Sequence, residues 1–172
     1  MKIGKIILIV LILALVGIQF VRPAKNTSNV KTYDVATKYP VPTEVANILD
    51  VACNDCHTNL TKYPWYASVQ PVAWFLNDHV VDGKRHLNFS EFTNRPIAVQ
   101  NHKFEEVIEM VKEKEMPLPS YTWLGLHSDA KLSDAQRETL INWAQTQMDS
   151  LKAQYPADSL VLRRRNAPAP SK

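Results

Sequence analysis

The sequence is poor in cysteine and glycine. Its 172 residues include two cysteines and four glycines, against eleven prolines. Two cysteines cannot make a disulfide framework, and no further cysteines are available to complete a four-ligand zinc site. Few glycines, together with long segments of periodic apolar residues, favour helices joined by proline-containing connections over a sheet.

The charge balance is also mild. The formal net charge is +3, and no stretch interleaves basic and aromatic residues. Nucleic-acid partners are recognised by strongly basic surfaces, so we expect no nucleic-acid binding. The length suits one domain of ordinary size with short appendages.

The two cysteines lie three positions apart, in Cys53-Asn54-Asp55-Cys56-His57. C-x-x-C-H is the attachment motif of a c-type haem. Two thiols can add across the two vinyl groups of haem, and the imidazole that follows is then the proximal iron ligand. The motif predicts one covalently attached haem c, held by Cys53, Cys56 and His57.

Two other interpretations of the cysteine pair remain. A thioredoxin-like dithiol is expected near a βαβ pattern, and the sequence offers no such strands. Half of a zinc site would need further nitrogen or sulfur ligands.

The N-terminus carries an uncharged apolar run from Ile6 to Val21, preceded by Lys2 and Lys5 and closed by Arg22. We interpret residues 1–22 as an uncleaved signal-anchor that forms a transmembrane helix. A cleaved signal peptide is the alternative, although no A-x-A-like site follows the run. Either segment would export the rest of the chain, which agrees with haem c, because bacteria attach this haem outside the cytoplasm.

Apolar periodicity predicts four helices after a polar tether at residues 23–42. The first begins at Thr43 and runs to the haem motif, with an apolar face that Cys53 and Cys56 continue. The second covers residues 68–81 and is followed by a polar turn, the third is centred on Phe104–Val111, and Ser133 with Gln136 caps the last. The haem domain is predicted over residues 43–155, and residues 156–172 form a basic, proline-rich tail.

The sixth iron ligand is the least determined part of the site. Met116 lies in Glu115-Met116-Pro117-Leu118-Pro119, where two prolines hold the thioether in a constrained loop, and it is our first candidate. His79, in the apolar arc of the second helix, is an alternative ligand or a core histidine.

For His57, we expect a backbone carbonyl near Tyr63–Tyr66 to accept a hydrogen bond from the second ring nitrogen. Packing in the core is the simplest role for Trp65 and Tyr66.

The order of these features resembles that of the small monohaem cytochromes c. W-F-L-N-D-H-V-V-D-G-K-R-H-L-N-F-S-E-F together with E-M-P-L-P-S-Y is more closely similar to the bacterial haem-binding domain family of anchored C-x-x-C-H proteins, over about residues 40–150. The resemblance implies an all-α, cytochrome c-like domain with covalent haem. By analogy with the cytochromes, Cys53 and Cys56 form the thioethers, His57 is the proximal ligand and Met116 the distal ligand.

These features predict an electron carrier rather than an enzyme. We expect the domain at the outer face of the cytoplasmic membrane, single-pass and facing the periplasm, with membrane redox proteins as partners. The alternative is a haem sensor or peroxidase-like enzyme with an open iron position, in which His79, His86 or His102 would serve as distal acid or base.

Overall fold

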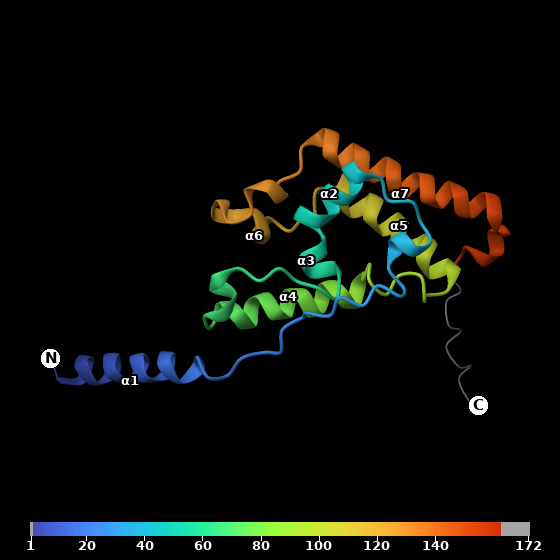
Figure 1. Cartoon of the computed structure of the whole chain (residues 1–172). Coiled ribbons are helices and arrows are strands. Elements are labelled where there is room, and N and C mark those ends of the chain that lie inside the picture. Colours follow the sequence, from blue (N-terminus) through green and yellow to red (C-terminus); the bar gives the residue numbers. More distant parts are fainter. Residues whose placement is uncertain (1, 163–172) are drawn as a thin grey trace, which may run out of the picture. The chain divides into compact units, whose positions relative to one another are not determined.

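The computed structural model describes residues 2–162, and their regular structure is helical (Figure 1). Within this range, strand pairing is limited to two isolated bridges, Thr27 with Leu60 and Tyr33 with Glu91. The seven α-helices are α1 (Lys2–Ile18), α2 (Thr43–Ala52), α3 (Asn54–His57), α4 (Val72–His86), α5 (Ile97–Lys112), α6 (Pro119–Thr122) and α7 (Asp134–Gln154). The described residues also form five short 3₁₀ turns, of which the first four lie between the helices and the last follows α7: η1 (Val35–Thr37), η2 (Trp65–Ser68), η3 (Trp123–Gly125), η4 (Ser128–Ala130) and η5 (Ala157–Ser159). The prediction of an all-α fold is confirmed.

The chain divides into two compact units. The first comprises the described residues up to Val30 together with Asn54–Asn88, and the second comprises Lys31–Cys53 together with the described residues from Phe89 onward. The chain passes from the second unit into the first between Cys53 and Asn54, inside the C-x-x-C-H motif.

The first unit is built on α4, which contacts both α3 and η2. Ala73 and Val80 are the buried residues of α4. This helix runs to His86, five residues beyond the predicted end at residue 81, so the expected polar turn is partly helical. Gly83 therefore lies in a helix interior, where it takes on a packing role described below.

The second unit has an aromatic core between α5 and α7. Phe104 of α5 is fully buried, and its ring lies 4.9 Å from those of Tyr39 and Phe92 and 5.5 Å from that of Trp143. The indole nitrogen of Trp143 donates a hydrogen bond to the Pro40 carbonyl at 2.8 Å. This satisfies the polar atom of a buried indole and attaches the segment before α2 to α7.

The last helix begins where the sequence predicted. Ser133 is its N-cap, and the reciprocal hydrogen bonds between Ser133 and Gln136 form the expected capping box. Met148 is buried in the same helix. Residues 163–172 of the predicted tail lie outside the described residues, whereas Leu160, just before them, is buried.

The N-terminal segment does not meet the expectation of a transmembrane helix. α1 has 17 residues, and at about 1.5 Å per residue it extends roughly 25 Å, less than the ~30 Å of a bilayer core. Between residues 2 and 162, no helix combines the length and the apolar character needed to cross a membrane.

Candidate functional site

The C-x-x-C-H motif occupies a break between two helices. α2 ends at Ala52, Cys53 leaves the helical conformation with φ −129° and ψ −44°, and α3 starts again at Asn54. The apolar face of α2 therefore does not continue through Cys53 to Cys56 as one helical face, contrary to the sequence prediction. Both cysteines are half-buried, and neither forms a disulfide.

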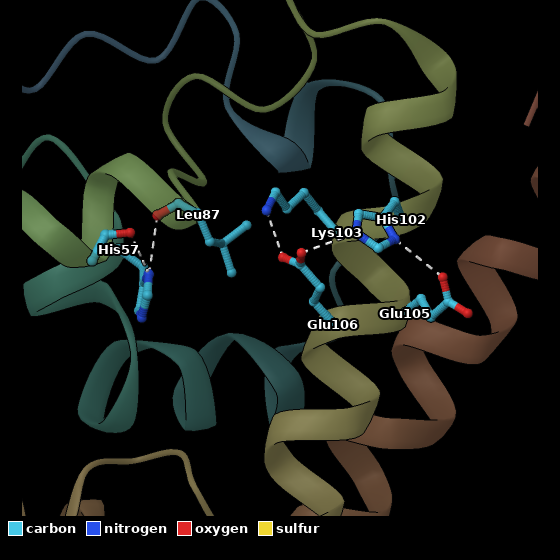
Figure 2. Close-up of polar contacts among 7 residues, drawn as sticks. His57, Leu87, His102, Lys103, Glu105 and Glu106 are labelled. Atoms are coloured by element: carbon cyan, nitrogen blue, oxygen red, sulfur yellow. Dashed lines mark hydrogen bonds and ion pairs between the residues drawn. The ribbon is translucent and has the colours of Figure 1, made fainter. Parts of the chain in front are cut away.

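His57 is fixed by two backbone carbonyls of α4 and its C-cap. Its Nδ1 lies 3.0 Å from the carbonyl oxygen of Gly83 and 3.0 Å from that of Leu87 (Figure 2). Carbonyl oxygens only accept hydrogen bonds, so Nδ1 carries the proton and donates to both. In the neutral ring, Nε2 then keeps its lone pair, which is the form that binds a metal. The acceptors are not in the Tyr63–Tyr66 segment, where the sequence analysis expected one.

Burial keeps this ring neutral. Burial is the largest influence on His57 and lowers its pKa, while the hydrogen bonds to Leu87 and Gly83 act in the opposite direction. The net effect is a lowered pKa, which favours the neutral ring whose Nε2 keeps the lone pair that binds a metal.

Gly83 also sets the distance between α3 and α4. A Cβ built on Gly83 would lie 2.7 Å from the Cys56 carbonyl oxygen and 3.1 Å from Cys56 Cβ. Both atoms are held by the backbone, so neither could swing aside. The missing side chain therefore allows α3 to lie against α4, and the Gly83 carbonyl then reaches His57.

Cys56 is a neutral thiol in this environment. Burial and, as the smaller influence, the neighbouring Asp55 carboxylate together raise the pKa of its sulfhydryl group to about 11. The thiolate is the reactive form of cysteine in disulfide exchange, so this environment is unlike that of the low-pKa thiols in C-x-x-C oxidoreductases.

Asn26 supports the segment after the motif. Its amide nitrogen donates to the Thr58 carbonyl at 2.8 Å and to Thr61 Oγ1 at 2.9 Å, and its Oδ1 accepts from Lys84 Nζ at 2.6 Å. Its backbone N–H donates to the Tyr63 hydroxyl. One polar side chain thus ties the loop after His57 to α4.

Met116 belongs to the second unit, directly after α5. Arg137 of α7 donates to the carbonyls of Val111 at 3.0 Å and Met116 at 2.7 Å, and the Met116 N–H donates to the Met110 carbonyl. The backbone of the Met-Pro loop is therefore fixed to both α5 and α7. The Met116 side chain is half-buried.

Two of the histidines considered as distal groups, His79 and His102, have other partners. The two ring nitrogens of His102 lie 3.2 Å from Glu105 Oε2 and 3.0 Å from Glu106 Oε1, and Lys103 pairs with Glu106 on the same helix (Figure 2). Because both nitrogens of His102 are engaged, it is a poor candidate for an iron ligand. His79 hydrogen-bonds through Nδ1 to the Phe75 carbonyl at 2.8 Å and packs its ring on Phe75.

Trp65 does not have the core position that seemed the simplest role. Its side chain is 82 % exposed, next to the half-buried Tyr66. Among the residues from 2 to 162, no group of three or more His, Cys, Asp or Glu side chains is placed to hold a metal ion by itself.

Comparison with known proteins gives one match. The model of the haem-binding domain family matches residues 13–146. This range is well over half of the 172 residues, and the chain therefore belongs to the haem-binding domain family. The resemblance noted in the sequence is confirmed at this level, and haem is supported as the cofactor. No curated protein and no solved structure shows a significant match.

Replacing Gly83 should disturb the motif. Gly83→Ala gains about 1 kcal/mol of helix propensity, but overpacking against Cys56 costs about 1–3 kcal/mol. We expect a lower thermal midpoint for the haem-free protein and faster alkylation of Cys56. Gly17→Ala is the matched control, because a Cβ at that helical glycine meets nothing within 4 Å. If Gly83→Ala were as stable as Gly17→Ala, the close approach of α3 and α4 would be wrong.

The state of His57 can be measured directly in the haem-free protein. Nitrogen-15 NMR should show the Nδ1–H tautomer and a titration midpoint below the ordinary value of about 6.5. Because the folded state disfavours the imidazolium, stability should be unaffected above that ordinary value and should fall as the pH drops below it. A midpoint at or above about 6.5 would contradict the assigned environment.

Proposed function

We propose that the protein is a monohaem c-type cytochrome that carries electrons outside the cytoplasm, at the outer face of the cytoplasmic membrane. The observation that carries the proposal is the pair of carbonyls on His57 Nδ1, which leaves Nε2 as the metal-binding atom. Membership in a haem-binding family supports haem as the group that this nitrogen binds.

The cysteines supply the covalent attachment in this proposal. Cys53 and Cys56 each add their S–H across one vinyl group, the sulfur bonding to one carbon and the hydrogen to the other. No oxidant or reductant is needed for either addition. Neither cysteine forms a disulfide, so both keep the S–H group that this addition needs.

His57 orients and tunes the iron in the same scheme. Donation of the Nδ1 proton to two carbonyls fixes the ring orientation and increases the basicity of Nε2. When bound, haem supplies one-electron redox chemistry, which no side chain of this protein could supply alone.

Met116 is the distal ligand in the proposal. Arg137 holds the Met116 carbonyl to α7, so the loop backbone has a fixed position from which a thioether can be presented. A methionine opposite a histidine raises the reduction potential, and an iron with two protein ligands leaves no open position for peroxide or gas. These properties suit an electron carrier that exchanges electrons with redox proteins at the membrane.

Covalent attachment is tested on denatured protein. Expressed with haem-maturation machinery, the wild type should keep its haem through denaturing electrophoresis, and the double substitution Cys53→Ala/Cys56→Ala should lose it. The single substitutions should each retain one thioether and a shifted reduced spectrum. Absence of haem staining in the wild type would contradict the c-type assignment.

The distal ligand is tested by visible and near-infrared spectroscopy. The oxidised protein should show the weak charge-transfer band of sulfur-to-iron ligation, and the reduced protein should not bind carbon monoxide. Met116→Leu should abolish the band and open the iron to carbon monoxide. Met148→Leu is the matched control, because Met148 is a buried core residue of α7. An unchanged spectrum in Met116→Leu would exclude this ligand, and carbon monoxide binding by the wild type would favour the sensor or enzyme alternative.

A further inference from the structure

The first unit carries an apolar helix without a polar face. Every side chain from Ile6 to Leu13 in α1 is more than half exposed, and all eight are apolar. A soluble helix covers its apolar residues on one side against a core, and a helix that is apolar all round needs an apolar environment on every side. Water is therefore a poor surrounding for α1.

The end of α1 is attached to the beginning of α4 by hydrogen bonds. Gln19 and Gln70 pair reciprocally: the Gln70 N–H donates to Gln19 Oε1 at 3.0 Å, and Gln19 Nε2 donates to the Gln70 carbonyl at 3.2 Å. The Val21 carbonyl accepts from Gln70 Nε2 at 2.6 Å and from Trp74 Nε1 at 3.1 Å. Gln70 is buried, so this attachment is part of the first unit and not a loose linker.

Exposed apolar side chains occur in the chain segments next to this attachment. We call Phe20, Trp65, Val69 and Val72 the apolar collar. Phe20 follows Gln19, Val69 precedes Gln70, Val72 begins α4, and Trp65 begins the 3₁₀ turn just before them. Phe20 is 84 % exposed, Val69 43 % and Val72 37 %. A cluster of exposed apolar side chains with an exposed tryptophan is typical of a binding surface.

Basic residues lie in the same part of the chain. Arg22 and Lys25 follow the attached segment, and Lys25 Nζ lies 5.3 Å from the centre of the Tyr63 ring. Tryptophan and basic side chains are enriched at the boundary between lipid and water, where the indole ring spans both environments and cations approach anionic headgroups.

We propose that the apolar collar rests on the surface of a lipid bilayer that contains anionic lipids. We choose lipid as the partner because α1 needs an apolar environment on every side. The Gln19–Gln70 hydrogen bonds join α1 to the segment that carries the collar, so the same environment should reach the collar. The contact goes beyond electron transfer, and it does not depend on how haem is attached. It would hold the first unit in one orientation on the membrane, rather than on a free tether.

The test is hydrogen exchange measured by mass spectrometry on the full-length, haem-loaded protein. Vesicles of phosphatidylcholine with phosphatidylglycerol should slow exchange in peptides covering residues 65–73 by about tenfold, together with α1. The triple substitution Trp65→Ser/Val69→Ser/Val72→Ser should lose the protection at 65–73 and keep that of α1. Val81→Ser is the matched control, because Val81 is an exposed apolar residue of α4 (55 % exposed) outside the collar.

Three results would overturn the proposal. Protection of α1 with no change at residues 65–73 would mean that the collar stays in water. Protection of residues 65–73 that depends on protein concentration, without vesicles, would mean that a second copy of the chain covers the collar. A mature protein that lacks α1 would remove the continuity on which the inference depends. The haem spectrum of each sample reports separately on the proposed function.

Discussion

The structure depends above all on the contact between Gly83 and the Cys56–His57 pair. The absence of a side chain at Gly83 lets the carbonyl of Cys56 approach α4. The carbonyls of Gly83 and Leu87 then accept hydrogen bonds from His57 Nδ1. One backbone position thereby controls both the packing of α3 and the tautomer of its histidine. A larger residue at this position would change both properties together.

The second unit contributes by fixing a loop rather than a side chain. Arg137 donates to two carbonyls at the end of α5, and the aromatic core around Phe104 holds α5 against α7. Met116 thus has a backbone fixed to both helices, from which the thioether is presented in the proposed ligand role.

The first unit joins its apolar helix to the same α4 that holds His57. Gln70, two residues before α4, is buried and hydrogen-bonded to Gln19 at the end of α1. Gly83 lies near the other end of α4. An electron carrier exchanges electrons only when its haem edge faces a partner. If the collar rests on lipid as proposed, α4 would connect that contact rigidly to His57. The connection would therefore restrict which redox partners the proposed haem can face.

The sequence alone determined the features that are encoded locally. The C-x-x-C-H motif, which predicts a haem protein, lies within five residues, and the Ser133–Gln136 capping box lies within one helical turn. Tertiary structure decided the rest. Every residue has a carbonyl, so nothing in the sequence indicates that those of Gly83 and Leu87 accept hydrogen bonds from His57. The exposure of Trp65 and the pairing of His102 with two glutamates likewise depend on the folded structure. The motif identified His57, but contacts between residues far apart in the sequence determined which carbonyls bind its ring.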